Sequence, residues 1–228
     1  EISACLVGSE MCIRDRLIIV AAIFLFIMAD YVNACSMIAF QNLLDDSLQA
    51  IVNKPVEALV VVAILPAIIE EFLFRGMIYR GIANKSNKKI VIIISALLFA
   101  FLHMNFNQMC YAFVMGLVFA IVIYLTDNLS VSILLHMLFN AFTVIITCFE
   151  KSNAIQAILQ CNIAGYTLFN PSLTDTQGKI EISLLIIGGL IAILSAVIAG
   201  WLILLIAKTE KTTETTINNE NILKDNDN

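Results

Sequence analysis

The stretch LPAIIEEFLFRGMIYR, residues 65–80, places two adjacent carboxylates, Glu70 and Glu71, inside an apolar run that begins at Ala58. Without its charged residues this run would have the composition of a membrane-spanning helix. A charge near the centre of a bilayer costs at least about 2.5 kcal/mol, even on the mildest insertion scale. Charged side chains at that depth therefore indicate a functional site.

The whole chain has the composition of a polytopic membrane protein. Of its 228 residues, 60% are hydrophobic and 14% are charged, and the mean hydropathy is +0.92. Soluble domains carry about 25% charged residues. Much of the acidic excess behind the net charge of −5 lies in residues 209–228, so it does not indicate nucleic-acid binding.

The two ends of the chain differ from its centre. The stretch LVGSEMCIRDR, within residues 1–16, resembles the conceptual translation of a sequencing adapter. We therefore predict that residues 1–16 are not native and that the natural N-terminus, with room for one or two further helices, is missing. Residues 208–228 are polar and are predicted to form a disordered tail.

Six segments are predicted to span the membrane. A spanning helix needs about 20 mostly apolar residues, and the third segment is short by that rule. The six segments are residues 17–40, 56–80, 90–103, 109–125, 129–149 and 182–207. The predicted fold class is an all-α, polytopic integral membrane helix bundle, with its membrane domain over residues 17–207.

The distribution of Lys and Arg predicts the orientation of this bundle. Basic residues cluster in RGIANKSNKK, residues 80–89, and Lys208 and Lys211 follow the last span. Short cytoplasmic loops carry such an excess. With alternating spans both groups fall on one side, so the C-terminus is predicted to be cytoplasmic and residues 41–54 and 150–180 external. The predicted location is a bacterial plasma membrane.

Both histidines of the chain lie within predicted spans. His136 and Asn140 are four residues apart and therefore project from one helix face. At a rise of about 1.5 Å per residue, Glu70, His103 and His136 all fall near the bilayer midplane, which is compatible with one shared site. A single His or Asn in a membrane helix more often makes a packing hydrogen bond. The joint occurrence of these residues favours a functional site.

The two adjacent glutamates differ in their expected partners. Glu71 and Arg75 are four residues apart with the acid first, the favourable order for an ion pair. Glu70 points about 100° away around the same helix and has no partner there. The spacing thus predicts one paired and one unpaired carboxylate.

Three motifs on three predicted helices resemble those of the CPBP intramembrane proteases, also called the Abi family. EEFLFR at 70–75 resembles the EExxxR motif, FAFLH at 99–103 the FxxxH motif, and HMLFN at 136–140 the HxxxN motif. The likeness covers roughly residues 56–149. The family includes CAAX prenyl endopeptidases and proteins of bacteriocin processing or immunity.

The resemblance implies an intramembrane endopeptidase. It implies that Glu70 is the general base that activates water, assisted by His103, and that His136 and Asn140 stabilise the oxyanion. The supporting residues are Glu71, Arg75 and Phe99. Peptide hydrolysis needs a base near a water and donors where negative charge develops. A neutral His136 is expected to be one of these donors.

The residues are compatible with two mechanisms and with more than one function. Glu70, His103 and His136 could form a three-ligand zinc site with an open position, whereas a water-activating glutamate needs no metal. An alternative function is a catalytically silent scaffold or a bacteriocin self-immunity protein of the same fold. A proton-coupled transporter is disfavoured, because no inverted repeat or pair of broken helices is visible. The expected partners are a peptide or membrane-protein substrate and the lipid bilayer, with no nucleic acid.

Overall fold

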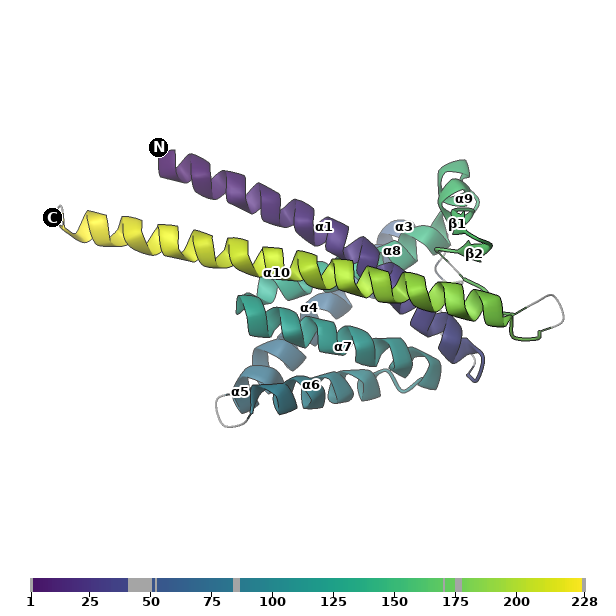
Figure 1. Cartoon of the computed structure of the whole chain (residues 1–228). Helices are drawn as coiled ribbons and strands as arrows, with labels where there is room; N and C mark the ends of the chain where they lie inside the picture. The colour runs from purple at the N-terminus through teal and green to yellow at the C-terminus, as the bar shows by residue number, and fades with distance from the viewer. Residues whose placement is uncertain are drawn as a thin grey trace.

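The computed structural model describes residues 2–40, 51, 53–83, 87–169, 171–174 and 178–226. Within these ranges, the side chains of residues 2–11, 214 and 216–226 are not described. The described chain consists of helices and one small two-stranded hairpin (Figure 1). This confirms the prediction of an all-α membrane helix bundle. Most of the predicted loop at 41–54 lies outside the described residues.

The described elements follow one another along the chain in this order. The first half contains α1 (Ile2–Met37), α3 (Pro55–Ala58), η1 (Leu59–Ile64), α4 (Leu65–Glu71), η2 (Phe72–Tyr79) and α5 (Arg80–Ala83), where η marks a π-helical segment. The second half contains α6 (Lys88–Leu102), α7 (Phe106–Thr126), α8 (Leu129–Cys148), α9 (Asn153–Leu159), β1 (Asn162–Ile163), β2 (Tyr166–Thr167) and α10 (Ile182–Asn226).

The two longest helices, α1 and α10, pack against each other and cross over the rest of the bundle (Figure 1). Helix α7 contacts both of them, and α8 contacts α1. Helix α6 packs on α7, and the helical stretch from α3 to α5 packs on α8 and α6. The main core lies where α1, α7 and α8 meet and includes Phe26, Phe119 and Leu135.

The stretch from α3 to α5 is helical throughout but changes between α and π registers. Pro66 has no N–H to donate to the carbonyl of Val62, four residues earlier. Just before it, the N–H of Leu65 bonds to the carbonyl of Val60, five residues earlier, which is the π pattern. Such segments often occur at functional sites. Here the irregular turn comes immediately before the two glutamates.

Hydrogen bonds show which helix ends lie together. Arg80 donates to the carbonyl of Asp127 at 2.8 Å. Glu210 accepts from Arg14 at 2.8 Å and from Asn128 at 3.2 Å. These contacts place Arg80, at the start of the basic cluster, and the charged part of α10 at the same end of the bundle, as alternating spans require. Which compartment this end faces stays a prediction.

Four helices in the described part of the chain are long and apolar enough to cross a membrane: Cys12–Met37, Phe106–Thr126, Leu129–Cys148 and Ile182–Thr213. These helices correspond to the first, fourth, fifth and sixth predicted spans. The third predicted span forms α6, which has 15 residues, fewer than the roughly 20 that cross a bilayer. The second is divided into short α and π segments that carry charged side chains.

The chain ends also differ from expectation. Helix α10 continues through Asn226, so residues 208–226 are helical where disorder was predicted. No Pro or Gly interrupts them, and those are the residues that most disfavour a helix. Helix α1 begins at Ile2 and includes most of residues 1–16, whose foreign origin stays a prediction.

A glycine sets the close approach of α6 and α7. A Cβ at Gly116 would lie 3.0 Å from Cα of Ala96 and 3.2 Å from its carbonyl oxygen. Backbone atoms cannot rotate away as a side chain does, so the helices would have to separate. Because α6 carries Phe99 and His103, this contact positions residues of the predicted site.

Gly116→Ala is expected to lower the free energy of unfolding by about 1–3 kcal/mol, the usual cost of overpacking. Gly200→Ala is the matched control, because a Cβ there would meet nothing within 4 Å. Thermal unfolding of both variants in detergent, followed by circular dichroism, measures the difference. Equal stability of the two variants would show that α6 and α7 have room to separate.

Candidate active site

Glu71 is a fully buried carboxylate that accepts hydrogen bonds from three side chains. Arg75 Nη1 lies 2.7 Å from Oε1, and Ser132 Oγ donates to Oε2 at 2.5 Å. His136 Nδ1 lies 3.1 Å from Oε1. Ser132 and His136 are on α8, so Glu71 joins α4 to that helix.

Arg75 is the cation that neutralises Glu71, as the spacing predicted. Its Nη2 also donates to the carbonyl of Gly116 on α7 at 2.8 Å. Its Cζ lies 4.5 Å from the ring centre of Phe99 and 5.4 Å from that of Phe119. A guanidinium is attracted to aromatic faces at such distances. A buried ion pair needs further partners of this kind to offset the loss of water.

The contact with Glu71 fixes the orientation of the His136 ring. A carboxylate paired with Arg75 can only accept, so Nδ1 of His136 carries the hydrogen. In a neutral imidazole Nε2 is then without a hydrogen. The expectation that a neutral His136 donates a hydrogen bond at the site is therefore corrected. Only the imidazolium form can donate from Nε2.

Glu70 lies at the edge of this network and reaches it only through a long contact with His136, an ion pair when that histidine is protonated. Its Oε2 is 3.9 Å from Nε2 of His136, and its side chain is 20% exposed. Oε2 is nevertheless buried and has no hydrogen-bond partner among the described residues. The sequence predicted this contrast between a paired Glu71 and an unpaired Glu70.

His103 ends α6 and lies on the same cavity as Glu70 and His136. Its Nδ1 is 2.9 Å from the carbonyl oxygen of Phe99. A carbonyl only accepts, so Nδ1 carries the hydrogen and Nε2 of the neutral ring is left as an acceptor. The Phe99 ring lies 5.1 Å from the His103 ring and 5.7 Å from the His136 ring. Phe99 therefore contacts both histidine rings.

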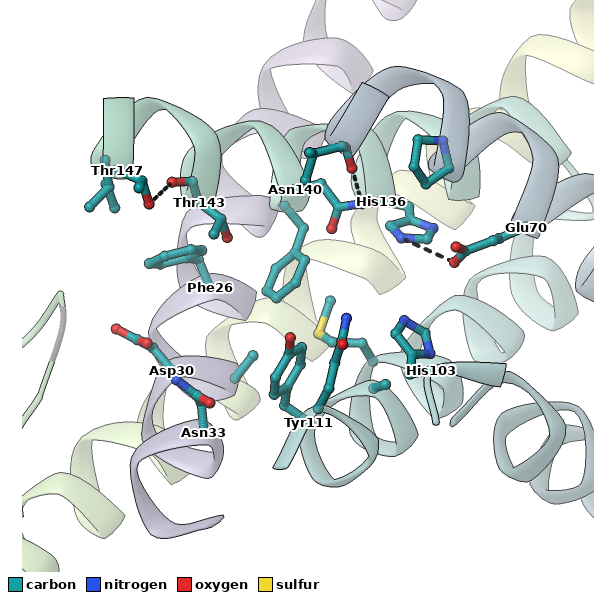
Figure 2. A pocket seen from close by; sticks show the side chains of 18 of the residues that line it. Phe26, Asp30, Asn33, Glu70, His103, Tyr111, His136, Asn140, Thr143 and Thr147 are labelled. Atoms are coloured by element: carbon teal, nitrogen blue, oxygen red, sulfur yellow. Dashed lines mark hydrogen bonds and ion pairs between the residues drawn. The ribbon is translucent and has the colours of Figure 1, made fainter. Parts of the chain in front are cut away.

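Asn140 is held by the irregular helix that precedes Glu70. Its Nδ2 donates to the carbonyl of Val62 at 3.2 Å (Figure 2). This is the carbonyl to which Pro66 cannot donate. An amide nitrogen has two hydrogens, so the second remains for another acceptor. Asn140 lies on the same helix face as His136, as predicted, and both line the cavity.

A cavity of about 490 Å³ connects these residues. Figure 2 shows Glu70, His103 and His136 on one side of it, with Asp30, Asn33, Thr143 and Thr147 away on the other. Its volume is within the range of small-molecule and peptide-side-chain pockets. The structure thus brings together all four predicted catalytic residues around one space.

The side chains around the cavity do not form a set of metal ligands. Among the described residues, no group of three or more His, Cys, Asp or Glu side chains could hold one. Glu70, His103 and His136 share the cavity but are not arranged as a three-ligand set. The zinc site considered from the sequence does not fit the residues as they lie.

Sequence reasoning missed several residues that build the site. Ser132 lies four residues before His136 and shares its helix face, a spacing that could have found it. Phe119 stacks on His136 with ring centres 4.8 Å apart, and no local pattern marks it. Pro66 marks a helix irregularity, but its effect on Asn140 depends on a helix distant in sequence.

Comparison with known proteins identifies the part of the chain that carries the site. Residues 52–142 match the family model "Type II CAAX prenyl endopeptidase Rce1-like". Over 116 residues, 48% of this chain and 47% of the relative, the chain is 34% identical to "Membrane-embedded CAAX protease MroQ" of Staphylococcus aureus (strain USA300). Both matches support the CPBP family for this part of the chain.

The matched residues, 52–142, include every residue predicted for the site, from Glu70 to Asn140. The chain spans about half the length of the curated relative that it matches. No solved structure matches the chain. The family supports a membrane-embedded peptidase, whereas the role of each residue is a matter for proposal.

Arg75→Ala is expected to reduce the amount of folded protein strongly, because it leaves Glu71 buried and unpaired at a cost of about 3–5 kcal/mol. Arg80→Ala is the matched control: Arg80 is 45% exposed in its ion pair with Asp127, where such pairs contribute about 1 kcal/mol or less. Monodisperse yield from membranes and thermal unfolding measure both. A well-folded Arg75→Ala protein would show that Glu71 does not depend on this cation.

Proposed function

We propose that the protein is an intramembrane endopeptidase that hydrolyses a peptide bond inside the cavity, with Glu70 as the general base. The position of Glu70 is the observation that carries the proposal. Its buried Oε2 has no hydrogen-bond partner among the described residues, and it faces the cavity beside two histidines. An unsatisfied buried oxygen is costly, and here it can accept a proton from a bound water.

Glu70 and His103 act together on that water. Both present acceptor atoms, the carboxylate oxygen of Glu70 and Nε2 of His103. Each can accept a hydrogen bond from one of the two hydrogens of the water. The lone pairs of the water oxygen then point toward the carbonyl carbon of the substrate. As the new C–O bond forms, Glu70 takes the proton and negative charge develops on the substrate oxygen.

His136 and Asn140 stabilise that negative charge. Glu70, Glu71 and Arg75 together carry one negative charge, so an imidazolium at His136 makes the buried group neutral. Burial favours such balance, because uncompensated charge is costly away from water. His136 then donates from Nε2, and Asn140 donates its second amide hydrogen. Preorganised donors of this kind are often the largest single term in catalysis.

The second half of the reaction returns the proton. When the tetrahedral intermediate collapses, the C–N bond breaks and Glu70 gives its proton to the leaving amine. The new carboxyl group and the amine leave the cavity, and Glu70 is again a carboxylate. No step requires a group beyond these four side chains and water.

A catalytically silent scaffold or a bacteriocin self-immunity protein is the alternative. The hydrogen bonds of Glu71 and the contact of Asn140 with Val62 would stabilise such a protein equally well. The unpaired carboxylate of Glu70 favours catalysis, because a scaffold would gain stability from an apolar residue at that position.

The proposal of an intramembrane endopeptidase also implies a class of substrate and a location. The substrate is a peptide or a segment of a membrane protein that reaches the cavity from the bilayer. The protein is proposed to lie in a bacterial plasma membrane. The end of the bundle with Arg80, Lys88 and the charged part of α10 is proposed to face the cytoplasm, in accord with the positive-inside rule.

The function is tested by comparing the peptides released in cells that produce the wild type with those released in cells that produce the Glu70→Gln variant. Glu70→Gln keeps size and hydrogen bonding and removes the basic oxygen. We expect mass spectrometry to find at least one Glu70-dependent peptide, and its cleavage by the purified wild type should survive dialysis against a strong chelator. Absence of any Glu70-dependent peptide would contradict catalysis. Stoichiometric zinc that is lost in His136→Ala, with activity restored only by added metal, would replace the metal-free mechanism.

His136→Ala and Asn140→Ala are each expected to lower kcat for that peptide by about 10²- to 10³-fold, the usual loss for an oxyanion donor. Because both serve one oxyanion, the double variant should lose less than the product of the single losses. Thermal unfolding of Asn140→Ala, measured in parallel, separates catalysis from the contact with Val62. Unchanged kcat with lowered stability would assign Asn140 a structural role only.

A further inference from the structure

The cavity extends well beyond the proposed catalytic residues. It continues toward the end of the bundle where α1 ends and α7 begins, and late residues of α1 and α8 line it there. Figure 2 shows Asp30, Asn33, Thr143 and Thr147 in this part of the cavity, away from Glu70. We call these four residues and Glu150, which also lines the cavity, the distal subsite.

The distal subsite presents hydrogen-bond acceptors. Oδ1 of Asn33 is buried and has no hydrogen-bond partner among the described residues, while its Nδ2 lies 3.8 Å from Sδ of Met37. The hydroxyl of Thr147 donates to the carbonyl of Thr143 at 2.9 Å, which leaves its oxygen as an acceptor. A buried amide oxygen without a donor is costly, so a ligand that brings a donor would be favoured there.

Both charged side chains of the distal subsite are acidic, and Glu150 is the more exposed of the two. Asp30 and Glu150 both line the cavity, and no Lys or Arg is found among its described lining residues. A positively charged group that leaves water needs negative charge and acceptors to replace its hydration. This combination suits a cation and disfavours an anion.

Several apolar side chains line the cavity, alongside the polar Gln108 and Tyr111. Phe26 and Phe139 line it with ring centres 5.8 Å apart, and Ala112 and Met115 of α7 also contribute. A substrate that crosses from the catalytic residues to the distal subsite passes these side chains. An apolar residue would be favoured between the cleaved bond and the cation.

Helix geometry gives the spacing. From Asn140 to Thr147 the rise along α8 is about 10 Å, at about 1.5 Å per residue. An extended peptide covers about 3.3 Å per residue. A group bound at Thr147 is therefore about three residues from one bound at Asn140.

We propose that the distal subsite binds one positive charge of the substrate, a Lys or Arg side chain or a free amine, about three residues from the cleaved bond. The proposal rests on the proposed function and names a feature of its substrates. The acceptor atoms, the two carboxylates and the continuous cavity carry it together.

Binding to the inactive Glu70→Gln chain in nanodiscs tests the proposal without hydrolysis. The probes are fluorescent apolar peptides with a single Lys, each paired with the same peptide carrying acetyl-lysine, which removes the charge and keeps the length. Each probe is made with a free and with an acetylated N-terminus, which shows whether the bound charge is the N-terminal amine or the Lys side chain. Fluorescence anisotropy is expected to show about tenfold tighter binding of one charged probe than of its neutral pair, the effect of hydrogen bonds to charged groups.

Asp30→Asn combined with Glu150→Gln should reduce this preference to about twofold or less, by removal of the two charges. Glu181→Gln is the matched control, because Glu181 is exposed and lies outside the cavity, and it should keep the full preference. Thermal unfolding confirms that each variant is folded. Equal binding of charged and neutral probes, a preference that survives the double substitution, or no binding of any charged probe would overturn the proposal. Glu70-dependent cleavage without a charge preference would leave the proposed function standing.

Discussion

The buried contact between Glu71 and Arg75 is the interaction on which the site depends. It is 2.7 Å long, and both side chains are fully buried. Such a pair is rarely a gain in stability by itself, because both charges leave water. It persists here because Ser132, His136 and the carbonyl of Gly116 supply further hydrogen bonds. The same contacts connect α4, η2, α7 and α8, so the ion pair sets where the proposed catalytic side chains lie.

The second determinant of the site is an irregular helix rather than an ion pair. Pro66 cannot donate to the carbonyl of Val62, and Asn140 donates to it instead. A regular helix would satisfy that carbonyl internally and leave Asn140 without this anchor. Asn140 thus connects the backbone before Glu70 to α8, the helix that carries His136. Local irregularity in a membrane helix is tolerated when a neighbouring side chain satisfies the backbone in this way.

The sequence predicted the parts of the site that depend on spacing within one helix. The Glu71–Arg75 pair and the shared face of His136 and Asn140 follow from positions four residues apart. It could not predict the stacking of Phe119 on His136, because that contact joins helices α7 and α8 and depends on their rotation. Apolarity alone also does not distinguish α6, which packs on α7 with 15 residues, from the four described helices that are long enough to cross a bilayer.

The contact of His136 with Glu71 also constrains how the reaction can run. Because Nδ1 donates to a carboxylate that cannot return a hydrogen, His136 is useful to an oxyanion only as an imidazolium. Its proton is then balanced by Glu70, whose Oε2 lies 3.9 Å from Nε2. In the proposed mechanism Glu70 takes one proton from water and loses its negative charge as the substrate oxygen becomes negative. The total charge of the buried site and its substrate therefore stays constant through the step, which is the arrangement that a medium of low polarity favours.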